Sequence, residues 1–173
     1  YQFCNLSEVV VRPNDSEKTL VNKVRLATIL GTLQSCLTDF KYLRAVWKKN
    51  TEEERLLGVS LTGIMDNDIT NGKLEHLPTL LNKLRRTAID VNKQFAKALN
   101  IPESASITCV KPSGTVSQLV DSASGIHARH NPYYIRTVRA DNKDPLTQFM
   151  TDSGIPAEAD VMKPDSTTEF SFP

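Results

Sequence analysis

Three cysteines are the side chains of this sequence with the clearest capacity for redox or nucleophilic chemistry. Cys4, Cys36 and Cys109 are an odd number, widely spaced, and form no CxxC pair. A zinc site needs Cys and His ligands in a close and recognisable spacing. The three histidines are not spaced with the cysteines in that way, so we expect no metal site and treat any cysteine chemistry as that of individual thiols.

Two of these thiols have simple structural interpretations. Cys4 lies in the apparent strand Phe3-Cys4-Asn5-Leu6, and Cys36 lies among small and polar residues of an apparent helix. Free cysteine is often a small buried hydrophobe, and sequence spacing offers neither thiol a partner. From the residues alone, a packing role is the favoured interpretation of both.

Residues 108–118 form the second segment that could bind a ligand. A predicted strand there leads into the glycine turn Ser113-Gly114-Thr115, and a helix or a single helical turn follows. Free backbone N–H groups at such a turn, together with two hydroxyls, suit a phosphate group. The GxxxxGK[ST] spacing of a Walker loop is absent. A plain strand-to-helix turn is therefore the alternative interpretation.

The polar loop 125–130 carries His127 and His130, and loops of this kind often carry function. Hydrogen bonding of one imidazole within the structure is favoured over catalysis. Arg136, Arg139 and Lys143 could face an acidic partner, but because 133–139 is predicted as a strand with basic and apolar side chains, a solvated strand face is the simpler interpretation.

Composition narrows the class of protein. The 21 Lys and Arg residues nearly balance the 20 Asp and Glu residues, so a net charge of +1 gives no general reason to expect direct nucleic-acid binding. Mean hydropathy is -0.32 and no apolar run is long enough to cross a bilayer, so we do not expect a membrane protein. Without a secretory pattern or paired cysteines, we expect a reducing, cytoplasmic compartment.

The hydrophobic spacing predicts an α/β fold. Helices are expected at 16–40 with Ser16 as the cap, at 56–65 as a short buried element, at 77–99 and at 145–154. Strands are expected over residues 2–11, which end in Val9-Val10-Val11, and at 105–110, 133–139 and 167–172. The length of 173 residues suits one domain. Because both ends have the pattern of strands, we expect the chain to be cut from a longer polypeptide.

Four motifs in sequence order resemble adenosylcobalamin-dependent (class II) ribonucleotide reductase. They are QFCNLSEV at 2–9, ATILGTLQS at 27–35, EEERLLGVSLTG at 52–63 and VKPSGTVSQ at 110–118, and GIH at 125–127 and YYIR at 133–136 follow them. The resemblance covers nearly the whole chain. The residues of the KPSGTVSQ motif favour the cobalamin-dependent group over the oxygen-dependent and anaerobic relatives.

The resemblance implies a ten-stranded α/β barrel built from two parallel half-barrels. The whole chain, residues 1–173, would be a single part of that barrel at its C-terminal side. In this family a thiyl radical on a cysteine, generated with adenosylcobalamin, abstracts the 3′ hydrogen of a ribonucleotide. A cysteine pair then reduces the ribose, the 2′ hydroxyl leaves as water, and the pair becomes a disulfide.

The resemblance also implies roles for particular residues. Cys4 matches one of the two reducing cysteines, whose partner would lie in a missing N-terminal part of the same barrel. The substrate phosphate loop is matched by Pro112, Ser113, Gly114, Thr115 and Val116. Cys36 and Cys109 match no family role, so we expect them to be structural. No residue marks the cobalamin site or distinguishes diphosphate from triphosphate substrates.

Two hypotheses follow for the function. In the first, the chain is part of a ribonucleotide reductase that converts ribonucleotides to deoxyribonucleotides with a thiol reductant such as thioredoxin. We expect it to be inactive alone, because the motif of the radical cysteine is not in the sequence. In the alternative, the chain is a free-standing α/β module that binds a phosphorylated ligand through the Ser113-Gly114-Thr115 turn, and Cys4 only packs.

Overall fold

The computed structural model describes all 173 residues and divides the chain into two compact units, Tyr1–Arg129 and His130–Pro173. The first unit contains β1 (Asn5–Val10), α1 (Glu17–Gln34), α2 (Ala45–Glu54), β2 (Leu57–Thr62), the 3₁₀ helix η1 (Ile64–Asp66), α3 (Leu77–Leu99) and α4 (Val116–Leu119). The second contains β3 (Arg136–Asp141), α5 (Pro145–Asp152), β4 (Ala157–Ala159) and β5 (Thr167–Phe172). The predicted α/β class is confirmed.

Strands β1 and β2 form a parallel pair in the first unit, with Asn5 opposite Leu57 and Val10 opposite Thr62. The predicted strand 105–110 pairs with β2 on the edge away from β1 but forms a single parallel bridge, between Thr108 and Val59. Backbone bonds from Val59 N to Ile107 O and from Cys109 N to Val59 O hold it there. The three segments therefore form a short parallel surface.

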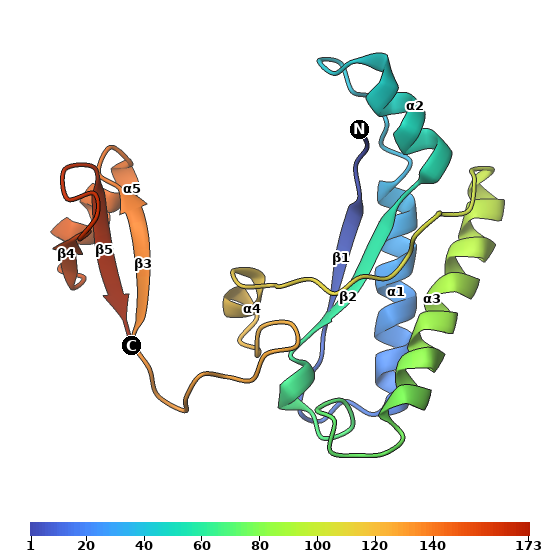
Figure 1. Ribbon diagram of the computed structural model, residues 1–173, viewed down its shortest axis with the longest axis horizontal. Helices are drawn as coiled ribbons and strands as arrows, with labels where there is room; N and C mark the ends of the chain where they lie inside the picture. Colours follow the sequence, from blue (N-terminus) through green and yellow to red (C-terminus); the bar gives the residue numbers. More distant parts are fainter. The chain divides into compact units, whose positions relative to one another are not determined.

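Helices α1 and α3 lie side by side on one face of this surface (Figure 1). Ser16 caps α1 in a capping box with Thr19, as the sequence predicts, although the helix ends at Gln34 rather than near residue 40. Helix α3 has the predicted bounds. The apolar faces of both helices meet the strands in one hydrophobic core, formed by Val9, Val11, Leu20, Val24, Ala27, Val59, Leu80, Leu84 and Ala88.

The prediction of a short buried helix at 56–65 is wrong, because this segment is strand β2 followed by η1. The apolar content of 56–65 suits a short buried helix, but Leu57, Val59 and Leu61 alternate with small or polar residues, and this period of two is the pattern of a strand. The polar segment before it, for which no helix was predicted, forms α2. Exposed ion pairs between Lys48 and Glu52 and between Lys49 and Glu53 lie along that helix.

The second unit is an antiparallel sheet of order β3-β5-β4 with helix α5. Phe170 of β5 is fully buried and centres its small core. The interpretation of Arg139 as part of a solvated face agrees with its side chain, which is 69% exposed, and its guanidinium also pairs with Asp160 and Glu169 at 2.7 and 2.8 Å. The hydrogen bonds of these two carboxylates raise the pKa of Arg139.

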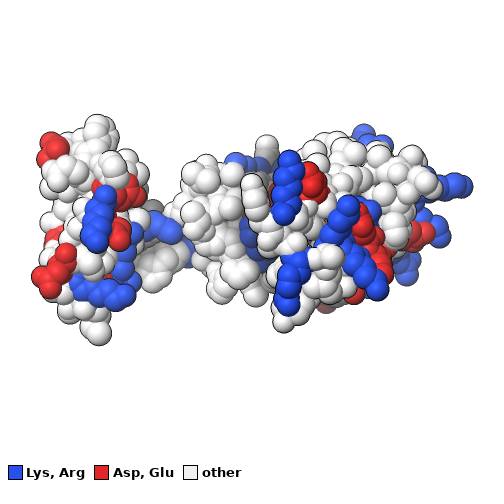
Figure 2. All heavy atoms as spheres, turned by 90° about the horizontal axis from the view of Figure 1, so that it is seen from above, with Lys and Arg blue, Asp and Glu red and all other residues white.

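The sheets of the two units have two and three strands, so the ten-stranded barrel implied by the resemblance remains a prediction. Basic and acidic side chains are intermixed on the face that Figure 2 shows, in agreement with the balanced composition. None of the helices combines the length and the apolar character that a bilayer span requires.

Candidate functional site

The pleat of β1 and β2 sorts their side chains onto two faces. On the helix face, a Cβ added at Gly31 of α1 would touch the side chains of Leu57 and Ser7. The alternate residues therefore point to the opposite face, which we call the cysteine face. It is formed by Cys4, Leu6, Glu8, Gly58, Ser60, Cys109 and Lys111.

Cys4 and Cys109 converge on Gly58 at the centre of this face. A Cβ built on Gly58 would lie 3.3 Å from the sulfur of Cys4, 3.0 Å from that of Cys109 and 2.4 Å from a methyl group of Leu6. Any side chain at residue 58 would therefore collide with its neighbours. Because Gly58 has no side chain, two thiols from separate segments can approach the same point.

The packing interpretations of the cysteines are wrong for Cys4 and Cys36, because both thiols are exposed, as is that of Cys109. Cys36 belongs to a different place, since its sulfur lies 3.7 Å from the carbonyl oxygen of Thr32 at the end of α1. Sequence spacing does not reveal the meeting of Cys4 with Cys109, which depends on the order of three parallel segments.

Both thiols of the cysteine face are held in their neutral form. Partial shielding by neighbouring groups raises the pKa of Cys4, and the nearby sulfur of Cys109 raises it further. Shielding also raises the pKa of Cys109, where the charge of Lys111 acts in the lowering direction and that of Glu8 in the raising direction. Neither thiol is therefore an activated thiolate in this chain.

An ion pair crosses the same face between Glu8 of β1 and Lys111, with 3.0 Å between Oε2 and Nζ. The second carboxylate oxygen of Glu8 is buried and accepts no hydrogen bond. Lys111 directly precedes the predicted phosphate turn. The pair thus connects the cysteine strand to the base of that turn.

The turn itself, Pro112 to Val116, has the form predicted from the sequence. Ser113 adopts φ +56° and is only 4% exposed, and its hydroxyl has no hydrogen-bond partner. Gly114 and Thr115 are exposed, and the backbone N–H groups of Gly114, Thr115 and Val116 donate to no other group of the chain. Helix α4 behind them has only four residues, so its dipole is small.

A second loop, 121–127, supports this turn, a role that the sequence pattern does not reveal. Ser124 donates from its hydroxyl to the carbonyl oxygen of Pro112 at 2.7 Å. The Gly125 N–H donates to Thr62 at the end of β2, and a Cβ on Gly125 would lie 2.7 Å from the Lys111 carbonyl oxygen. The glycine is therefore required by close packing of two backbones.

Asp66 and Arg129 fix the other side of the loop. The Asp66 carboxylate accepts from the backbone N–H of Ala123 at 2.8 Å and from the Arg129 guanidinium at 3.2 Å. Arg129 also donates to the side chain and the carbonyl oxygen of Asp121, and its bonds to the two carboxylates raise its pKa. The sequence favours a structural hydrogen bond for one of the two histidines. His127 agrees with this, because its Nδ1 lies 3.2 Å from the Ser124 carbonyl oxygen.

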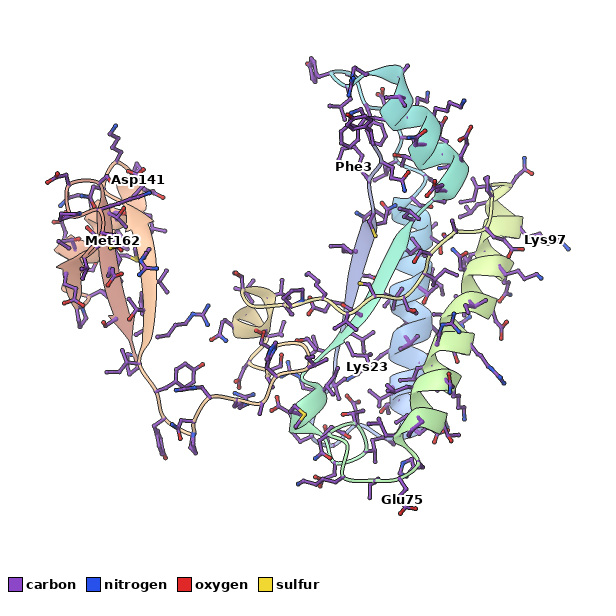
Figure 3. The ribbon with its side chains drawn as sticks, viewed as in Figure 1. Phe3, Lys23, Glu75, Lys97, Asp141 and Met162 are labelled. Carbon is purple, nitrogen blue, oxygen red and sulfur yellow. The ribbon has the colours of Figure 1, made fainter.

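Aromatic side chains surround the start of β1. Figure 3 shows Phe3 beside α2, where its ring packs 5.0 Å from those of Phe40 and Trp47. Next to it, a pocket of about 240 Å³ includes Cys4, Gln34 and Thr51 in its lining. Cys4 is therefore reachable from solvent on the α2 side as well.

The chain is similar over most of its length to proteins named adenosylcobalamin-dependent ribonucleoside-triphosphate reductase, which confirms the resemblance seen in the sequence. Identity is 32% over 130 residues with that of Euglena gracilis and 29% over 185 residues with that of Lactobacillus gasseri, covering 73% and 93% of this chain. For Lactobacillus delbrueckii subsp. bulgaricus it is 27% over 159 residues, covering 78%. No protein-family profile matches the chain.

A solved structure shares the fold. The crystal structure of a B12-dependent (class II) ribonucleotide reductase superposes with a TM-score of 0.67 over 98% of this chain, at 24% identity. The chain covers 27% of that structure and spans 18% to 25% of the length of the three relatives described above.

Proposed function

We propose that this chain is the C-terminal part of the catalytic barrel of an adenosylcobalamin-dependent ribonucleotide reductase, and that both of its units belong to that barrel. The observation that carries the proposal is the position of Cys4. The cysteine that the sequence motif matches to a reducing thiol is exposed on the sheet face opposite the helices, and Glu8 and Lys111 link that face to the predicted phosphate turn. Similarity to the named reductases over most of the chain supports the same assignment.

Cys4 supplies one of the two thiols that reduce the ribose. Two thiols give two electrons and two protons, the 2′ hydroxyl leaves as water, and the sulfurs join in a disulfide. An external dithiol such as thioredoxin then returns the pair to its reduced state. Because its raised pKa keeps Cys4 protonated near neutral pH, the thiol holds the proton that this chemistry consumes.

The turn from Pro112 to Val116 binds the phosphates of the substrate. Its three free N–H groups are the donors, and the unpaired, buried hydroxyl of Ser113 is a further polar group whose hydrogen bonding the chain itself leaves unsatisfied. Loop 121–127 keeps the turn in place before the nucleotide arrives, which lowers the ordering cost of binding.

Adenosylcobalamin supplies the radical when it is bound to the complete enzyme. The corrin ring of this cofactor already holds its cobalt ion, so its site does not require a cluster of metal-ligating side chains, and no residue of this chain marks that site. We assign the cofactor site, the radical cysteine and the second reducing cysteine to the remainder of the barrel.

The test replaces Cys4 by Ser in the complete enzyme that carries this sequence. We expect turnover with an external thiol reductant to be lost, while ribonucleotide binding is retained because the phosphate turn is untouched. Cys36→Ser is the matched control and should keep turnover, since Cys36 lies away from the cysteine face. Multiple turnover at the unchanged rate by the Cys4→Ser enzyme would exclude Cys4 from the mechanism.

A further inference from the structure

The cysteine face contains a second thiol to which neither the resemblance nor the proposed function assigns a role. The sulfur of Cys109 lies as close to Gly58 as that of Cys4, at 3.0 and 3.3 Å from the point that a Cβ on Gly58 would occupy. Two sulfurs that both lie so near one point are within a few ångströms of each other. The effect of Cys109 on the pKa of Cys4 agrees with this proximity.

We propose that Cys4 and Cys109 form one thiol–disulfide exchange pair. When a small-molecule disulfide places its thiol on Cys4 as a mixed disulfide, Cys109 attacks the Cys4 sulfur and expels that thiol. The complete reaction converts two protein thiols and one external disulfide into one Cys4–Cys109 disulfide and two external thiols, so that atoms and electrons balance. This inference stands on the geometry of the two cysteines and does not depend on the proposed reductase function.

Three features of the face permit the sulfurs to join. Gly58 has no side chain to stand between them. Cys4 precedes Asn5, the first residue of β1, and Cys109 follows the single bridge at Thr108, so both thiols are at the ends of their ladders. A disulfide requires its Cα atoms within about 7 Å, and the two segments lie on opposite edges of β2, so closure requires the residues before β1 to move toward Cys109.

The Leu6 side chain shares the space over Gly58 with the two thiols. Its Cδ2 methyl lies 2.4 Å from the point that a Cβ on Gly58 would occupy. The side chain is 49% exposed, which leaves it room to rotate away. We therefore expect Leu6→Ala to speed the exchange several-fold, because its shorter side chain leaves more of the space over Gly58 to the sulfurs.

The experiment treats the reduced chain with oxidised glutathione, quenches with acid, and measures intact mass and a peptide map. We expect the wild-type chain to lose two hydrogens, with Cys4 joined to Cys109 and no glutathione retained. Cys109→Ser should instead keep one glutathione on Cys4. Cys36→Ser is the matched control and should behave as the wild-type chain does.

Gly58→Ala keeps all three cysteines and provides an independent check. Its methyl group would lie within 3.3 Å of both sulfurs and compete with them for the same space, so we expect glutathione to remain on Cys4. Wild-type chain that retains glutathione as fully as Cys109→Ser, or that joins Cys4 to Cys36, would overturn the proposal. The wild-type product decides the question even if a variant fails to fold.

Discussion

Lys111 and Glu8 form a 3.0 Å ion pair that joins the segment before the phosphate turn to the strand that follows Cys4. The Glu8 side chain is 8% exposed and that of Lys111 is 27% exposed, so the pair is largely removed from water. Such a pair fixes geometry even where its net contribution to stability is small. It is the direct physical link between the two functional parts of the first unit.

Glu8→Gln should destabilise the first unit, because it leaves the Lys111 ammonium partly buried without a counter-charge. We expect the free energy of unfolding to fall by about 1–2 kcal/mol. The loss would be larger if Lys111 were fully buried, because water could not then solvate its unpaired charge. Urea unfolding followed by the fluorescence of Trp47, the single tryptophan, measures the loss. Glu17→Gln removes an exposed pair with Lys83 and should cost clearly less than Glu8→Gln does. Equal losses for the two variants would contradict this account of the Glu8 pair.

Gly125→Ala should disturb the phosphate turn, because the new methyl group meets the Lys111 carbonyl oxygen at 2.7 Å on a backbone with φ +53°. Gly72→Ala is the matched control, since Gly72 also has a positive φ of +86° but has open space around it. The control should cost about 1–2 kcal/mol from the backbone alone, and Gly125→Ala roughly 2 kcal/mol more. Urea unfolding measures both, and backbone amide NMR shifts at residues 113–116 should change only in Gly125→Ala.

Alkylation of Cys4 and Cys109 by iodoacetamide should require a higher pH than alkylation of a cysteine thiol with an ordinary pKa. The thiolate is the reactive form, and a raised pKa moves the rate curve to higher pH. Cys109→Ser removes one raising influence, so it should shift the Cys4 curve to lower pH. Lys111→Gln removes a lowering influence and should shift the Cys109 curve to higher pH. Peptide masses after timed alkylation give each curve, and an unmoved Cys4 curve in Cys109→Ser would show that the thiols do not interact.

Leu20→Ala tests the core that positions these residues. Leu20 is fully buried in the core of the first unit, and its truncation should cost about 2–5 kcal/mol through lost transfer energy and a residual cavity. Leu30 lies on the same helix α1 but is 65% exposed, so Leu30→Ala should cost less than about 0.5 kcal/mol. Thermal or urea unfolding of both variants checks the difference, and similar losses would mean that α1 packs through another face.

Local patterns predict the helices well where one face is apolar and the ends are marked. Helix α3 has the spacing of a half-buried helix along its whole length, and Ser16 provides the cap of α1. In strand β2, Leu57, Val59 and Leu61 alternate with small or polar residues, so the strand was predictable from the sequence, and the helix prediction gave too much weight to the apolar content of 56–65. Helix α2 is not apparent from the sequence because its residues are polar and little of it is buried.

The candidate site is predictable in its parts but not in its assembly. The turn at 112–116 is a local feature, so its residues can be identified from the sequence. The approach of Cys109 to Cys4 depends on a parallel arrangement of segments about a hundred residues apart in the chain, and on the missing side chain of Gly58. The support from Asp66 and Arg129 depends on tertiary contacts of the same kind.

Nucleotide binding at the phosphate turn tests the central claim most directly. Backbone amide NMR shifts of the wild-type chain and Gly114→Val would be followed on addition of a ribonucleoside triphosphate, with the nucleoside as control. Gly114 has open space around it and no positive φ, so valine there should leave the fold intact. We predict shifts at Ser113 to Val116 with the triphosphate alone, and their loss in Gly114→Val. Equal responses to triphosphate and nucleoside, or shifts that avoid the turn, would contradict the proposed function.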